Sequence, residues 1–282
     1  MTNISLDLSN KIPQQTVKII ELVKTVADEL DIPVFLVGAT ARDLVLQYGY
    51  NLPKRSATRD IDFAVAIENW AEYDKLKQML IQTGNFQQDT RVEHRMFEVK
   101  TKTEIDIVPF GGIESPQGKI TWQTTEKEMN TNGFAEAYES ALNVKLSKNL
   151  TIKIVSPVGL AILKIIAWSD RRSNKDTTDF WLITKNYLDI GNNEDRIFDN
   201  YSNWLEDADY DYEIAGAKLL GIDIAKTSSE TTKWKILQIL EDEKKLKKLC
   251  LEIARFESRI EDNFSRVLEV IQKLKEGIIE KP

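Results

Sequence analysis

The chain has 282 residues, 42% of them hydrophobic, and its 45 acidic side chains against 38 lysines and arginines leave a net charge of -7. That balance excludes the overall basic character of a non-specific nucleic-acid binder, and the length suits one large domain or two ordinary ones. A single cysteine, Cys250, excludes an internal disulfide, and a single histidine, His94, excludes a zinc site with paired histidines. We therefore expect catalysis to rest mainly on carboxylates, lysines, hydroxyls and backbone donors, with Mg²⁺ as a natural metal.

The N-terminal segment MTNISLDLSNKIPQQ has neither the charged leader nor the apolar core of a signal peptide. The longest strongly apolar stretch, VGLAILKIIAW, is short and is interrupted by Lys164. We therefore expect a cytoplasmic protein with no membrane span.

A nucleic-acid partner would need a local basic face, because the chain as a whole is acidic. Three segments offer one: LPKR together with Arg59, RRSNK at 171–175, and KKLKK at 244–248. Each of them, taken singly, is better interpreted as solvated surface.

Helical and strand patterns alternate through the first part of the chain. The predicted elements are, in order, a helix over 14–30, a strand over 32–37, a helix over 41–50, a strand over 59–67 and a helix over 69–84. Two further strands, over 94–101 and 103–110, are expected to pair antiparallel around a turn near 100–103. The region from 120 to 150 fits no single pattern, and 151–156 is predicted to be another strand.

Beyond Pro157 the pattern changes to successive amphipathic helices. They are predicted over 157–169, 176–188, 194–205 and 210–225, followed by a long helical region from 231 to 277. We predict an α+β fold with an N-terminal α/β domain over 1–155, built on a mixed sheet, and a C-terminal helical domain over 156–282.

Two carboxylates stand in the predicted strand RDIDFAVAI. Side chains at positions i and i+2 of a strand share a face, so Asp60 and Asp62 are expected to project together. Their mutual repulsion raises proton affinity unless a cation lies between them. Asp106 stands in a second strand, EIDIVPF, and pairing of the two strands would assemble the ligands of a two-metal phosphoryl-transfer site. The alternative is that these acids form the polar face of a half-exposed strand.

Upstream, the apolar segment VFLV ends at Gly38 and a helix begins. Such a turn exposes backbone donors that suit a phosphate, with the Thr40 hydroxyl nearby. A glycine in a strand-to-helix turn also has a purely structural interpretation.

Lys164 stands in the apolar helix GLAILKIIAW and therefore needs a partner. Asp176 and Asp179 share a face of the next helix and are candidate partners. The ammonium group is alternatively placed to contact a nucleotide phosphate, and both roles stay open at this point.

The motifs VGATARDL, TRDIDFAV and EIDIVPF resemble the DNA polymerase beta-like nucleotidyltransferase superfamily. With LAILKIIAWSDRRSNKDTTDF added, the chain is most similar to the AbiEii and MenT group of toxin nucleotidyltransferases. The resemblance covers residues 34 to about 185 and draws its specificity from four motifs in order. One departure is Ala39, where the superfamily has glycine or serine.

The resemblance implies a role for each matching residue. Asp60, Asp62 and Asp106 would be the Mg²⁺ or Mn²⁺ ligands, and Asp106 would also activate the acceptor hydroxyl. The remaining assignments are Gly38 as the phosphate-binding turn, Ala39 and Thr40 as further nucleotide contacts, Lys164 as a phosphate contact and Asp176 as the acid of the last motif.

The implied activity is metal-dependent transfer of a nucleoside monophosphate from an NTP to an acceptor, with release of pyrophosphate. By the same resemblance, the acceptor would be RNA, such as tRNA, in a toxin–antitoxin or phage-defence system with a cognate antitoxin as partner. Two alternatives are a nucleotidyltransferase acting on a small molecule such as an antibiotic, and a nucleotide-binding protein without turnover.

Overall fold

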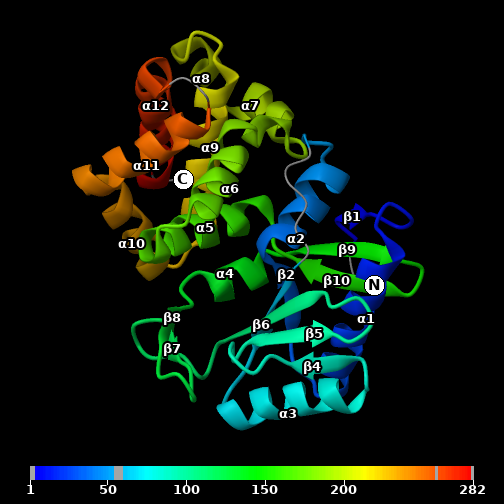
Figure 1. Ribbon diagram of the computed structural model, residues 1–282. Coiled ribbons are helices and arrows are strands. Elements are labelled where there is room, and N and C mark those ends of the chain that lie inside the picture. Colours follow the sequence, from blue (N-terminus) through cyan, green and yellow to red (C-terminus); the bar gives the residue numbers. More distant parts are fainter. Residues whose placement is uncertain (1–3, 54–59, 258–259, 281–282) are drawn as a thin grey trace. The chain divides into compact units, whose positions relative to one another are not determined.

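The computed structural model describes residues 4–53, 60–257 and 260–280 (Figure 1). The chain forms two compact units, Met1–Ser156 and Pro157–Pro282, and each is described by itself. The first unit holds a mixed sheet with helices and the second is a run of helices, so the predicted α+β class is confirmed.

The main sheet has eight strands in the order β1-β9-β10-β2-β3-β6-β5-β4. Its centre is β3, which pairs antiparallel with β2 on one side and parallel with β6 on the other. A small separate sheet pairs β7 with β8. The strands are β1 (Leu6–Asp7), β2 (Val34–Val37), β3 (Ile61–Ala66), β4 (Phe86–Gln88), β5 (Arg95–Glu98), β6 (Glu104–Phe110), β7 (Lys119–Thr121), β8 (Glu128–Asn130), β9 (Leu142–Ser147) and β10 (Leu150–Ile154).

The helices of the first unit follow the predicted apolar spacing. In α1 the side chains of Ile20 and Val23 are fully buried, and α3 begins where the Asn69 side chain accepts a hydrogen bond from the Glu72 amide. The helices are α1 (Gln14–Glu29), α2 (Gly38–Arg42), which continues as the π-helical η1 (Asp43–Gly49), α3 (Trp70–Gln82) and α4 (Phe134–Glu139). Figure 1 shows α3 beside β4, the last strand of the main sheet.

The unassigned region from 120 to 150 contains short elements. It holds β8, α4 and β9 and most of β7, and a further unpredicted strand, β4, follows α3. Strands of three residues are too short to show an alternating pattern of apolar and polar residues, so their pairing depends on neighbours distant in sequence.

The second unit consists of helices joined by short turns. They are α5 (Pro157–Arg171), α6 (Asn174–Lys185), the 3₁₀ turn η2 (Tyr187–Asp189), α7 (Asn193–Asn200), α8 (Ser202–Asp207), α9 (Tyr212–Thr227), α10 (Glu230–Glu241), α11 (Glu243–Phe256) and α12 (Ile260–Ile279). The long helical region predicted from 231 to 277 is divided into three. Asp242 ends α10 and caps α11, because its side chain accepts hydrogen bonds from the amides of Lys244 and Lys245. Among the described residues, no helix is long and apolar enough to cross a membrane.

Helices α9 and α12 approach each other so closely that their backbones touch. A Cβ added to Gly221 would overlap the carbonyl oxygen of Leu274, and one added to Gly277 would overlap that of Lys218. Two glycines facing each other across a helix pair permit this approach, which a side chain on either would prevent.

We predict that Gly221→Ala destabilises the helical unit by roughly 1–3 kcal/mol, because backbone atoms of α12 cannot move aside as a side chain can. Gly216→Ala in the same helix is the matched control, since its Cβ would meet the Leu188 side chain at 3.0 Å. The control gains the same helix propensity but meets a group that can shift. Urea unfolding followed by circular dichroism measures both, and equal stabilities would contradict the close contact.

Candidate active site

Strand register brings Asp62 and Asp106 together. The parallel pairing of β3 with β6 sets Asp62 opposite Asp106, and the antiparallel pairing of β3 with β2 sets Asp62 opposite Val37. Residues opposite each other on neighbouring strands share a face of the sheet. Asp106 is buried, with 8% exposure, and Asp62 is half-buried. Two of the three predicted carboxylates are therefore neighbours.

Asp60 is placed differently from its prediction. It precedes the first residue of β3, Ile61, and so does not share the pleat of the strand with Asp62. In the part of the chain that the structure describes, no group of three or more His, Cys, Asp or Glu side chains lies close enough to hold a metal ion. The full set of three ligands stays a prediction.

Gly38 lies against the carboxylate of Asp62. Its φ is +70°, and a Cβ at this position would overlap the Oδ2 atom of Asp62. Glycine is required twice here, once by the left-handed backbone and once by the space that the carboxylate occupies. The turn after β2 and the acid of β3 are therefore built as one unit.

Thr40 connects that turn to the start of the acidic strand. Its hydroxyl donates a 2.6 Å hydrogen bond to the backbone carbonyl of Asp60. The hydroxyl predicted to contact the nucleotide therefore has a partner within the chain. Gly38, Ala39 and Thr40 are all half-buried.

Arg95 binds the carboxylate of Asp106. The two residues face each other across β5 and β6. The Nε and Nη2 atoms of Arg95 donate to the two carboxylate oxygens at 2.8 and 2.9 Å, and Nη1 lies 2.7 Å from Glu104. The hydrogen bond to Asp106 raises the pKa of Arg95, so the guanidinium stays charged. Sequence reasoning missed this residue.

His94 also reaches Asp106, although the sequence assigned it no role. Its Nε2 atom lies 3.8 Å from Asp106 Oδ2, and its ring packs on Trp122 with the centroids 5.1 Å apart. Burial lowers the pKa of His94, and the charge of Asp106 opposes that shift. Because the net shift is downward, the imidazole is mainly neutral at pH 7.

The residues of this site suit a hard divalent cation. Carboxylate oxygens are the donors that Mg²⁺ and Mn²⁺ prefer, and Asp62 and Asp106 present them on one sheet face. The space above Gly38 accommodates the Asp62 carboxylate without steric conflict. In this form of the protein both oxygens of Asp106 are engaged by Arg95, which a cation would have to share or displace.

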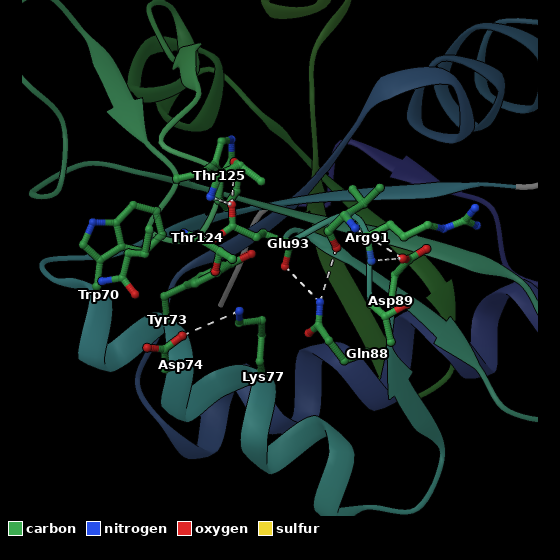
Figure 2. Close-up of a pocket in the computed structure, with 14 residues that line it drawn as sticks. Trp70, Tyr73, Asp74, Lys77, Gln88, Asp89, Arg91, Glu93, Thr124 and Thr125 are labelled. Atoms are coloured by element: carbon green, nitrogen blue, oxygen red, sulfur yellow. Dashed lines mark hydrogen bonds and ion pairs between the residues drawn. The ribbon is translucent and has the colours of Figure 1, made fainter.

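A pocket of about 310 Å³ lies in the same unit (Figure 2). Figure 2 shows Trp70, Tyr73 and Lys77 of α3 on one side and the loop that contains Glu93 on the other. The Glu93 carboxylate accepts three hydrogen bonds from Thr124 and Thr125, which clamp the two loops together. Burial of Glu93 raises its pKa, but these hydrogen bonds lower it further, so the net shift is downward.

The pocket is connected to the acidic pair through one residue. Trp122 lines the pocket and packs on His94, whose imidazole lies beside Asp106. The wall of the pocket therefore lies next to the carboxylate that sequence comparison assigns to the chemistry.

In the helical unit, Lys164 belongs to a buried cluster of ions. Its ammonium lies 2.7 Å from Asp179 and 3.4 Å from Asp176. Arg171 donates to both oxygens of Asp176 at 2.6 and 2.7 Å, and Asp176 has no exposed surface. The ion-pairing role considered for Lys164 is thus present, and its contact with a nucleotide stays a prediction.

The three basic segments differ in what the structure says of them. LPKR and Arg59 lie partly outside the described residues, since 54–59 are not among them. In RRSNK, Arg171 pairs with Asp176 and Arg172 packs over the Trp168 ring at 4.4 Å. In KKLKK, Lys248 lies 4.0 Å from Glu252. Intramolecular contacts therefore account for the two arginines of the second segment.

Comparison with known proteins gives one family. A model described as "Nucleotidyl transferase AbiEii toxin, Type IV TA system" matches residues 22–238. No curated protein matches the chain.

Three solved structures resemble the chain at low identity. The antibiotic-resistance factor ANT(2'')-Ia is 12% identical with a TM-score of 0.37, over 71% of this chain and 100% of that one. A CCA-adding enzyme with ATP is 15% identical with a TM-score of 0.35, over 95% of this chain and 71% of that one. The CCA-adding enzyme of Thermotoga maritima complexed with tRNA is 11% identical with a TM-score of 0.27, over 96% and 83%.

The family match is the finding that assigns the protein. It extends over most of the chain and across the boundary between the two units. It includes the Gly38 turn, both acidic strands and the helices that carry Lys164 and Asp176. The chain therefore belongs to the AbiEii family of nucleotidyltransferase toxins of type IV toxin–antitoxin systems, as its motifs predicted.

Proposed function

We propose that this nucleotidyltransferase transfers a nucleoside monophosphate from an NTP to RNA, with tRNA as the expected acceptor. Asp60, Asp62 and Asp106 are the proposed ligands of Mg²⁺ or Mn²⁺. The observation that supports this site best is the register of β3 and β6, which sets Asp62 opposite Asp106 beside the Gly38 turn. A cognate antitoxin is the further partner that the family description suggests.

The proposed chemistry assigns a task to each part of the first unit. A divalent cation, when bound, would stabilise the charge that develops on the attacking and leaving oxygens. Gly38 lets the chain backbone approach the phosphates, because no side chain intervenes at the turn. Asp106, beside the neutral His94, is the group proposed to accept the proton of the acceptor hydroxyl.

Lys164 and Asp176 belong to the second unit and extend the proposal to it. The ammonium of Lys164 is the candidate contact for the NTP phosphates, and Asp176 holds it from within α6. Asp179 and Arg171 complete the cluster that orients both groups.

The acceptor is tested by incubating the protein with each radiolabelled NTP, Mg²⁺ and total RNA. We expect label in the tRNA fraction with one preferred NTP, because the proposed function is transfer to RNA. Label confined to small molecules would replace RNA by a small-molecule acceptor. Absence of transfer with every NTP would contradict the proposed activity.

Asp62→Asn is expected to reduce transfer on the order of 10³-fold, because it removes one charge from the cation site while keeping the shape that fits Gly38. The melting temperature should stay within a few degrees, since one of two repelling carboxylates is neutralised. Asp28→Asn, at an exposed carboxylate of α1, is the matched control and should retain full transfer. Full transfer by Asp62→Asn would disprove the site.

Gly38→Ala is predicted to abolish transfer, since its Cβ would displace the Asp62 carboxylate. Gly84→Ala is a close control, because Gly84 has the same φ of +70° and no atom within 4 Å of its Cβ position. Both variants should lose roughly 1–2 kcal/mol of stability to backbone strain. Only Gly38→Ala should lose activity, measured as labelled product, and equal activities would contradict the role of the turn.

Lys164→Met should destabilise the protein by roughly 3–5 kcal/mol, because it leaves Asp179 buried without the cation 2.7 Å away. The double variant Lys164→Met with Asp179→Leu should recover much of that stability, measured by urea unfolding. Transfer should stay low in the double variant if Lys164 contacts the phosphates. Recovery of both stability and transfer would reduce Lys164 to a structural role.

A further inference from the structure

Arg95 joins two carboxylates of the same strand. Glu104 and Asp106 are two residues apart on β6 and share a face. The guanidinium donates to both oxygens of Asp106, at 2.8 and 2.9 Å, and lies 2.7 Å from Glu104 through its third nitrogen. All three nitrogens of the side chain are therefore engaged by acids.

The two acids differ in their surroundings. The side chain of Asp106 has 11% exposure and that of Glu104 has 43%. Asp106 also faces a second carboxylate, Asp62, across β3. A buried carboxylate beside another one needs a compensating cation, and in this form of the protein Arg95 provides it.

We propose that Arg95 is a positioning residue that holds Asp106 until a divalent cation binds, and that Glu104 then retains the released guanidinium. This inference rests on the proposed function, because it takes Asp106 to be a cation ligand. A cation between Asp62 and Asp106 would compete with Arg95 for the same two oxygens. Arg95 therefore lowers the affinity for the bare ion and keeps the acid oriented without it.

Glu104 makes the exchange reversible. The guanidinium does not have to enter solvent when Asp106 turns to the cation, since one of its nitrogens already contacts Glu104. Arginine suits this task because its planar group can bind two carboxylates at once. Lysine, a single point charge, would hold Asp106 less firmly.

The test measures Mn²⁺ binding to the full chain without nucleotide, by electron paramagnetic resonance of the free ion. Arg95→Gln should bind Mn²⁺ roughly tenfold more tightly than wild type, because one charge-assisted contact no longer competes. Glu104→Gln should bind it roughly threefold more weakly, because Arg95 then has Asp106 as its remaining carboxylate on β6. Arg91→Gln, at an exposed arginine just before β5, is the matched control and should match wild type.

Thermal unfolding in the presence of a chelator gives a second measurement. Arg95→Gln should melt at a lower temperature than wild type, and Mn²⁺ should raise its melting temperature by more than it raises that of wild type. If Arg95→Gln does not fold without metal, Arg95→Lys takes its place and should bind Mn²⁺ with an affinity above that of wild type.

Asp62→Asn separates the inference from the proposed function. If Asp62→Asn binds Mn²⁺ as wild type does, the proposed cation site and the inference both fail. If Asp62→Asn loses Mn²⁺ binding while Arg95→Gln or its lysine replacement binds no more tightly than wild type, the role of Arg95 alone is overturned.

Discussion

The repulsion between two carboxylates on adjacent strands is the constraint on which the site depends. Parallel pairing of β3 with β6 sets Asp62 opposite Asp106, and neither can move away without breaking the register of the central sheet. The structure meets this repulsion in two ways. Gly38 leaves space for one carboxylate, and Arg95 neutralises the other through a bidentate contact.

The helical unit solves a related problem with the same chemistry. Asp176 has no exposed surface, and Arg171 binds both of its oxygens while Lys164 lies between it and Asp179. Each unit thus keeps a buried acid ionised with an arginine whose own side chain is partly exposed. Such clusters cost stability, so we interpret them as preparation for charged ligands.

Sequence reasoning reached the family, the fold class and the order of the long elements because each has a local signal. The Gly38 turn and the acids of the two strands stand in contiguous motifs, and the helices show their apolar spacing directly. Arg95 was missed because its partner depends on the exact turn. A symmetric turn at 100–103 would set Phe97 opposite Asp106, whereas the observed pairing sets Phe97 opposite Glu104 and Arg95 opposite Asp106.

By itself, the sequence determined which chemical groups are available: carboxylates on apolar strands, a glycine before a helix, and a lysine among apolar residues that demanded a partner. Local pattern suffices for that, since burial and periodicity are properties of contiguous residues. The tertiary structure alone decided that Asp60 lies outside the strand, that Thr40 binds its carbonyl, and that Arg95 holds Asp106. These depend on strand register and on side chains brought together from distant positions, which no local pattern specifies.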